Sequence, residues 1–345
     1  MLKASFQKHT LRFKRPGGTS RGVLTTKDLW ILKVWDDVRP DITGLGECSI
    51  IYGLSPDPME RYEEKLTELT QHIHKADTVD LSDFPSVRFG LETALLDLRR
   101  GGERVLFPSE FTRGKKSIPI NGLIWMGSFR YMREQIIEKL DFGFDCIKLK
   151  IGAIDFEQEL SLLKMIRREF GREQLELRVD ANGAFKPQEA LEKLKRLSDF
   201  SIHSIEQPVK PGQWETMADL CRQSPVDIAL DEELIGIADT MVPHLLDVIR
   251  PHYIILKPSL LGGFDRSNRF IKEAAKRNIG WWVTSALESN IGLNAIAQWT
   301  ATLNNSMPQG LGTGSLFTNN FSSPLEVVRG GRLRYNIVNG NGGYR

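Results

Sequence analysis

Charged residues at the ends of apolar segments are the part of this sequence whose types and spacing can do chemistry. Lys148 and Lys150 stand two residues apart in the segment Cys146–Ile151, and residues two apart in a β-strand point to the same face. One charged residue also ends each of four later apolar segments: Asp180, Glu206, Asp231 and Lys257. Successive charges are about 25 to 30 residues apart, the length of one strand with its crossover helix. The spacing therefore predicts successive strand ends that bring these charges to one place.

Converging carboxylates predict a metal site. Asp180, Glu206 and Asp231 would repel one another unless a cation lay between them. Oxygen ligands without a nearby histidine or cysteine favour Mg²⁺ or Mn²⁺ over Zn²⁺. A lysine beside a divalent cation and a second lysine loses its proton more easily, so it can act as a general base. We therefore predict removal of a proton α to a carboxylate, with the resulting enediolate held on the metal.

The competing interpretation of these residues is structural. Taken singly, an acid such as Asp180 would more often be a helix N-cap or a surface residue. Lys148 and Lys150 would then be solvated lysines of an edge strand. The apolar neighbours of the lysines and the regular spacing of the acids favour the site. Glu232 and Glu233 follow the last acid directly. One of them is expected to orient a metal ligand, and the sequence does not decide which.

From Ser117 onward, short apolar segments alternate with amphipathic ones. The predicted strands are Ile118–Ile124, Cys146–Ile151, Leu175–Asp180, Ile202–Glu206, Asp227–Asp231, Tyr253–Lys257, Trp281–Ser285 and a short one at Gly310–Thr313. The predicted helices are Ser128–Leu140, Asp155–Phe170, Pro187–Leu197, Trp214–Arg222, Thr240–Val248, Gly263–Asn278 and Leu293–Thr302. Continuous apolar strands are typical of parallel sheets, and seven or eight such units favour a (β/α)8-type barrel. No Gly-x-Gly-x-x-Gly follows a strand to indicate a dinucleotide-binding sheet. In barrels the active site lies at the C-terminal ends of the strands, where the charges fall.

In the N-terminal part, the predicted strands and helices do not alternate. Three strands are predicted at about 2–13, 28–38 and 44–48, followed by helices at 59–75 and 86–100. We expect an α+β domain over residues 1–110, a barrel over 117–320 and a C-terminal segment, 321–345, that returns toward the first domain. A strand pair at 325–335 is expected to reach the N-terminal sheet. The polar stretch Pro16–Thr26 is predicted to be a loop, either an exposed hairpin connection or a mobile lid.

Composition excludes several classes of function. A formal net charge of +2 over 345 residues gives no case for binding nucleic acid or a membrane surface. The cysteines, Cys48, Cys146 and Cys221, lack metal-binding spacing and are expected to be reduced. Neither an apolar leader nor an 18-residue apolar run occurs in the sequence. We expect a cytoplasmic protein acting on a small carboxylate, and composition does not distinguish a monomer from a homo-oligomer.

Five motifs resemble the enolase superfamily, in its muconate-lactonising subgroup. They are Lys148-Leu-Lys150, Val179-Asp-Ala-Asn-Gly183, Glu206-Gln-Pro208, Asp231-Glu-Glu233 and Lys257-Pro258, in the family's order. The resemblance covers nearly the whole chain and implies a modified TIM barrel, (β/α)7β, preceded by an α+β capping domain. Within the subgroup, Thr284–Ser289 and Gly310–Gly314 resemble the o-succinylbenzoate synthase family. The histidine expected near the seventh strand of mandelate racemases and the Asp-x-Asp expected near the eighth strand of dipeptide epimerases are both missing.

The resemblance implies a role for each matching residue. Asp180, Glu206 and Asp231 would bind Mg²⁺, with Mn²⁺ as an alternative. Lys150 would remove the α-proton and return it to the departing hydroxide, with Lys148 assisting and Lys257 stabilising the enediolate from the opposite face. Substrate contacts are expected from Ser285, Asn182, Gly312 and Thr313. The implied reaction is dehydration of 2-succinyl-6-hydroxy-2,4-cyclohexadiene-1-carboxylate to 2-succinylbenzoate, a lyase step in menaquinone biosynthesis.

Three other functions remain open from the sequence. Lysines on two faces of one site also allow racemisation of an N-succinylamino acid or epimerisation of a dipeptide. A lysine at the end of a barrel strand can instead form a Schiff base with a carbonyl substrate. A binding protein without catalysis on the same barrel is the third. Substrate assay, borohydride trapping and a Lys150→Ala variant respectively discriminate these functions.

Overall fold

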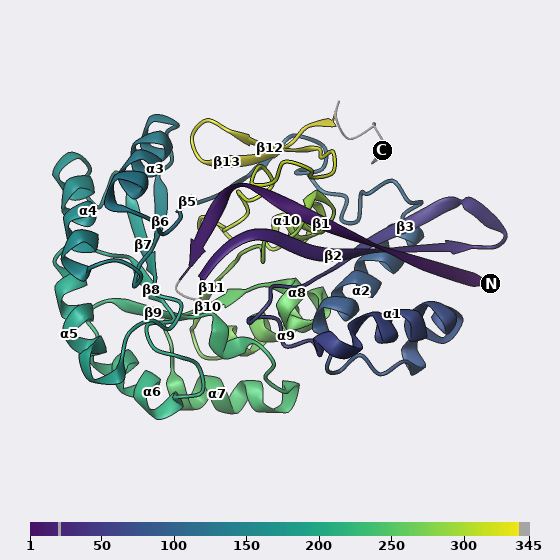
Figure 1. Ribbon diagram of the computed structural model, residues 1–345, viewed down its shortest axis with the longest axis horizontal. Coiled ribbons are helices and arrows are strands. Elements are labelled where there is room, and N and C mark those ends of the chain that lie inside the picture. The colour runs from purple at the N-terminus through teal and green to yellow at the C-terminus, as the bar shows by residue number, and fades with distance from the viewer. Residues whose placement is uncertain (20–21, 338–345) are drawn as a thin grey trace.

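The structure is a computed structural model that describes residues 1–19 and 22–337 (Figure 1). Its N-terminal part is an antiparallel sheet of β1 (Leu2–Thr19), β2 (Gly22–Asp36) and β3 (Arg39–Ser49). The sheet is followed by η1 (Met59–Arg61), α1 (Tyr62–Gln71), η2 (Ile73–Thr78) and α2 (Pro85–Arg99). Alternate residues of β2, such as Leu32 and Val34, are buried against Leu66 and Leu69 of α1. The predicted strands and helices of this α+β part are confirmed.

The predicted loop at Pro16–Thr26 is wrong for the residues that the structure describes. Strand β1 continues to Thr19 and β2 begins at Gly22, so the two form one long hairpin. The pairing register shifts between Arg12 and Gly17, which marks an irregularity instead of a strand end. A side chain at Gly18 would place its Cβ 2.3 Å from the Met126 carbonyl oxygen, so glycine is what allows the hairpin to approach the barrel. The central part of the predicted lid, residues 20–21, lies outside the described residues.

A seven-stranded parallel sheet forms the barrel, and it confirms the predicted fold class. Its strands, in spatial order, are β5 (Gly122–Ile124), β6 (Cys146–Lys150), β7 (Glu176–Asp180), β8 (Ser204–Glu206), β9 (Asp227–Leu230), β10 (Tyr253–Leu256) and β11 (Gly280–Val283). The helices around it are α3 (Phe129–Asp141), α4 (Phe156–Glu169), α5 (Pro187–Ser198), α6 (Trp214–Gln223), α7 (Val242–Ile249), α8 (Pro258–Leu261), α9 (Phe264–Ala275) and α10 (Asn290–Thr302). Two short turns, η3 (Glu232–Leu234) and η4 (Asp239–Met241), complete this part. All five residues of β6 are buried, as expected of a strand between a helical layer and a filled interior.

The eighth strand is much shorter than predicted. In place of a strand at Gly310–Thr313, two single bridges link Gln309 to Ile120 and Gly310 to Thr284. The Gln309 side chain also accepts a hydrogen bond from the Val283 backbone N–H, at 2.7 Å. These contacts close the ring between β5 and β11. Glycine is a poor strand former, which explains why this glycine-rich segment makes so few ladder bonds.

The C-terminal strand pair exists, but it does not join the N-terminal sheet. Strands β12 (Leu325–Val328) and β13 (Arg332–Tyr335) form a separate sheet with β4 (Ser117–Pro119). The residues just before this pair do return to the first domain, because the Thr318 N–H donates to the Arg12 carbonyl oxygen. Residues 338–345 of the predicted C-terminal segment lie outside the described residues. The predicted division into 1–110, 117–320 and 321–345 stays a prediction.

Among residues 1–19 and 22–337, no helix combines the length and apolar character needed to cross a lipid bilayer.

Candidate active site

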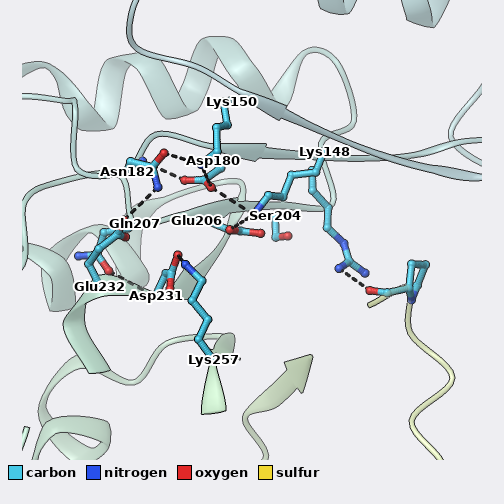
Figure 2. Close-up of polar contacts among 12 residues, drawn as sticks. Lys148, Lys150, Asp180, Asn182, Ser204, Glu206, Gln207, Asp231, Glu232 and Lys257 are labelled. Carbon is cyan, nitrogen blue, oxygen red and sulfur yellow. Dashed lines mark hydrogen bonds and ion pairs between the residues drawn. The ribbon is translucent and has the colours of Figure 1, made fainter. Parts of the chain in front are cut away.

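The register of three neighbouring strands places the central charges side by side. Lys150 of β6 is paired with Asp180 of β7, and Asp180 is paired with Glu206 of β8. Because all three stand at the last residue of their strands, they meet at the C-terminal edge of the barrel. Asp231 and Lys257 follow β9 and β10 directly and reach the same edge. The convergence predicted from spacing is therefore present (Figure 2).

Each lysine ammonium contacts a carboxylate of this group. Lys148 Nζ lies 3.1 Å from Asp180 Oδ2 and also forms a very short contact with Glu206 Oε2. Lys150 Nζ donates to Asp180 Oδ2 at 3.0 Å, and Lys257 Nζ donates to Asp231 Oδ2 at 2.5 Å. All of these side chains are largely shielded from solvent. The interpretation of the lysines as exposed edge residues is excluded.

The three carboxylates form a compact, buried triad. One oxygen each of Asp180, Glu206 and Asp231 lies within 4.8 Å of the others, and the three side chains are at most 1% exposed. Glu206 Oε1 and Asp231 Oδ1 are buried without a hydrogen-bond partner among the described residues. A buried unsatisfied oxygen is costly, and a cation among these acids would remove that cost. The triad therefore fits a metal ion bound by oxygen ligands alone.

Burial and neighbouring charges shift the pKa values of the acids and lysines in this group. Burial, together with the neighbouring carboxylates of Asp180 and Asp231, raises the pKa of Glu206 despite the opposing effect of Lys148. Burial lowers the pKa of Lys148 and Lys257, but the surrounding carboxylates outweigh it and raise both values. A lowered pKa at Lys148 or Lys257 would thus require the positive charge of a bound cation to offset these carboxylates.

Asn182 occupies a more specific position than a general substrate contact. Its side-chain oxygen accepts a hydrogen bond from Lys150 Nζ at 2.7 Å, and its amide nitrogen donates to Glu232 Oε1 at 2.9 Å. Glu232 is therefore the acid that faces the lysine and the triad. Glu233 instead accepts from Gln207 Nε2, at 3.0 Å, and supports the loop after β8. The sequence left this choice between the two glutamates open.

A cavity of about 840 Å³ opens onto these groups. Lys148, Lys150 and Lys257 line it. The N-terminal part of the chain also lines this cavity, through residues 22–24 of the hairpin and through Ile51, Tyr52 and Leu54 after β3. Such a cavity is large enough for a small organic substrate.

The predicted substrate-binding residues are brought together in this cavity. Ser285, Gly312 and Thr313 all line it, and the hydroxyl oxygens of Ser285 and Thr313 lie 2.6 Å apart. Asn121 and Thr284 also line it, each with a buried oxygen that has no hydrogen-bond partner among the described residues. Neither was among the predicted substrate contacts, although Thr284 begins the segment that resembles the synthase family. Asn121 interrupts an apolar segment that was predicted as one strand, and that polar interruption was the available signal.

Comparison with known proteins identifies the family. A family model described as "Enolase C-terminal domain-like" matches residues 131–342. The o-succinylbenzoate synthase of Desulfotalea psychrophila is 50% identical over 366 aligned residues, covering 95% of this chain and 98% of that protein. The chain belongs to the enolase superfamily, in its o-succinylbenzoate synthase family.

Further relatives within the enolase superfamily agree with this assignment. The crystal structure of MenC from Desulfotalea psychrophila LSv54 has a TM-score of 0.86 at 48% identity, covering 96% of this chain and 99% of that one. The N-succinylamino acid racemase of an Amycolatopsis species is 25% identical, over 92% of this chain and 88% of its own. The identity is thus much higher to the synthase than to this racemase of the superfamily.

Proposed function

We propose that this enolase-superfamily enzyme is an o-succinylbenzoate synthase, a lyase that dehydrates 2-succinyl-6-hydroxy-2,4-cyclohexadiene-1-carboxylate to 2-succinylbenzoate. The observation that carries the proposal is the 50% identity to a synthase over nearly the full length of both proteins. The group formed by the three lysines and the acidic triad supplies the chemistry that this reaction needs.

Asp180, Glu206 and Asp231 would hold a divalent metal, which we propose to be Mg²⁺, with Mn²⁺ as the alternative. Their donor set is oxygen only, and two of their buried oxygens have no partner among the described residues. When bound, the metal would supply positive charge to the ring carboxylate of the substrate and so acidify its α-proton. Lys148, whose ammonium contacts Asp180 and Glu206, would add a second positive charge beside the metal.

Lys150 would carry the proton in both halves of the reaction. Its neutral amine takes the proton from the ring carbon that bears the carboxylate, and the electron pair of that C–H bond passes to the carboxylate. The pair then returns to form the ring double bond while the adjacent C–O bond breaks. The departing hydroxide accepts the proton from the Lys150 ammonium and leaves as water. One base on one face is sufficient, because the same proton is removed and returned.

Two neighbours would hold this lysine and the charge that it creates. Asn182 Oδ1 accepts from Lys150 Nζ, which aims the amine at the substrate. Lys257 reaches the site from β10, four strands from β6 in the sheet order. Its ammonium would stabilise the negative charge that develops on the carboxylate. Ser285, Gly312 and Thr313, on the cavity wall, would contact the succinyl group.

The test is direct turnover. Purified protein with Mg²⁺ and the cyclohexadiene substrate should show the ultraviolet change that accompanies aromatisation, and EDTA should abolish it. Metal-dependent turnover supports the synthase. An inactive wild-type protein that is folded and supplied with Mg²⁺ contradicts the proposal.

A second candidate is racemisation of an N-succinylamino acid. It is favoured by the placement of Lys150 and Lys257 on separate strands around one triad, which allows proton exchange at two faces of one carbon. Incubation of N-succinylamino acids in D₂O would reveal it as α-deuterium incorporation with inversion. The absence of exchange would exclude the racemase. The predicted cytoplasmic location and the lack of nucleic-acid or membrane partners stay predictions, and the choice between a monomer and a homo-oligomer stays open.

A further inference from the structure

Lys27 is a buried lysine that the proposed reaction does not use. It lies on β2, where it is paired with Leu11 of β1, and is only 5% exposed. Its ammonium donates to the Ala286 carbonyl oxygen at 2.5 Å and to Ser49 Oγ at 3.2 Å. Burial of a lysine side chain is costly. The contact with Ala286 is also made between the first domain and the barrel, across 259 residues of sequence.

The segment that Lys27 contacts forms part of the catalytic cavity. Ser285, Ala286 and Leu287 all line the cavity. They follow β11 at the C-terminal edge of the barrel, where they lead into α10. Leu287 has a φ of +61°, a left-handed conformation that a leucine adopts only when surrounding contacts hold it. The wall is therefore a short, irregular segment whose shape depends on external support.

Two buried acids complete the support. Glu288 Oε2 accepts from the Ala286 N–H at 2.8 Å, and its other oxygen accepts from Ser259 Oγ at 2.5 Å. Glu47, from β3, accepts from the Ser289 N–H and the Gly292 N–H, each at 2.9 Å. Burial lowers the pKa of Lys27, and the negative charges of Glu288 and Glu47 oppose that shift. The two carboxylates thus favour the charged form of Lys27, whose ammonium donates to the wall.

The direction of this contact has a geometric consequence. A trans peptide holds its C=O and N–H groups on opposite sides of the chain. The Ala286 carbonyl oxygen is directed at Lys27, so the Leu287 N–H of the same peptide points away from Lys27. If the contact were lost, this peptide would be free to reorient beside Ser285, which lines the cavity. A change on β2 would then alter the wall of the cavity.

We propose that Lys27 is a positioning residue that fixes the Ser285–Leu287 wall of the cavity in its substrate-binding shape. The effect on kinetics rests on the proposed function, because it is read out with the cyclohexadiene substrate. Lys27 does not line the cavity, so it acts through the backbone of Ala286. Loss of its ammonium should weaken substrate binding more than it slows the chemical step at Lys150.

The kinetic test compares three variants. Lys27→Met keeps the aliphatic stem without the charge, Lys27→Arg keeps a donor, and Lys33→Met removes an exposed lysine from the same strand. In Lys27→Met, KM is expected to rise at least about tenfold while kcat changes less than about threefold. Lys27→Arg should recover most of the loss, and Lys33→Met should match the wild type. A folded Lys27→Met protein with wild-type KM, or one that loses only kcat, overturns the proposal.

A second measurement tests the role of Lys27 even if the enzyme does not catalyse the proposed reaction. Amide hydrogen exchange of peptides covering Ser285–Ser289 should be faster in Lys27→Met than in the wild type, and Lys27→Arg should restore protection. This readout needs no substrate, so failure of the proposed function leaves it intact. If Lys27→Met does not fold, Lys27→Gln takes its place, because glutamine is shorter but still polar. Unchanged exchange in a folded variant contradicts the proposal.

Discussion

Two groups of buried charges flank the same cavity, and they differ in how their carboxylate oxygens are satisfied. In the barrel, Glu206 Oε1 and Asp231 Oδ1 have no hydrogen-bond partner in the described part of the chain. At the junction with the first domain, Glu47 accepts from Ser289 and Gly292, and both oxygens of Glu288 accept a hydrogen bond.

The hydrogen bonding of the acids indicates different roles for the two groups. All four acids are completely or almost completely buried, so burial does not distinguish the groups. Hydrogen bonding does, because a buried oxygen without a partner costs about 1–3 kcal/mol and is retained where a ligand removes that cost. The barrel group has acceptor oxygens left over for the metal ion that we propose. The junction group is already complete and holds the wall of the cavity.

The largest expected effect is on catalysis by the barrel group. Lys150→Ala should lower kcat at least about a hundredfold, because a positioned general base contributes about 10²–10⁴-fold. The measurement is the ultraviolet assay with saturating Mg²⁺. Lys164→Ala, which removes an exposed lysine of α4, is the matched control and should retain full activity. Retention of turnover in Lys150→Ala would remove this lysine from the mechanism.

The next prediction compares one variant of the barrel group with one variant of the junction group. Glu206→Gln should weaken Mg²⁺ binding at least about tenfold, since even changes to groups that support metal ligands cost this much. Glu47→Gln should leave Mg²⁺ affinity unchanged, but it should lower the free energy of unfolding by about 1–3 kcal/mol through weaker bonds to the start of α10. Calorimetric titration with Mg²⁺ and urea unfolding measure the two quantities. Equal loss of Mg²⁺ affinity in both variants would invalidate the distinction.

The last prediction concerns Asp57, a buried acid of the N-terminal part. Asp57 Oδ1 accepts from the Ser86 N–H and hydroxyl, while Oδ2 has no partner among the described residues. Burial raises its pKa to about 6, so the folded state binds this proton more tightly than the unfolded state. Its contribution should therefore lower the free energy of unfolding by about 1–3 kcal/mol as pH rises from about 4 to 6, with no further change above that.

The Asp57 contribution is isolated by comparing variants. Urea unfolding between pH 4 and 7 should show that the free energy of unfolding of the wild type, minus that of Asp57→Asn, falls as pH rises from about 4 to 6. Asp41→Asn, at an exposed position, should keep the wild-type slope. A wild-type slope in Asp57→Asn would show that other groups cause the pH dependence.

The barrel site was largely predictable because it depends on a regular repeat. Lys150, Asp180 and Glu206 end successive strands, and parallel pairing places strand ends side by side. Asp231 and Lys257 follow from the same repeat. The sequence could not show that Glu232, and not Glu233, contacts Asn182, because this depends on where the loop after β9 directs two adjacent side chains.

The junction was not predictable for a different physical reason. Lys27 and Ala286 belong to separate domains, and no periodicity in the chain relates β2 to the end of β11. The strands of the hairpin were predicted too short because the glycines at 17 and 18 suggested a turn, whereas the structure uses Gly18 for close approach to Met126. The eighth strand was overestimated because its glycine-rich segment follows the spacing of the repeat but forms little of its ladder.

The junction contacts also determine when the site can be completed during synthesis. Lys27 donates to a carbonyl 259 residues later, and Glu47 accepts from an amide 242 residues later. At a synthesis rate of about 5–20 residues per second, these two buried charges would wait roughly 12–50 s for their partners. During that interval a cation and an anion of the first domain stay solvated or paired with other groups. The wall of the cavity therefore forms late, after most of the barrel has been made.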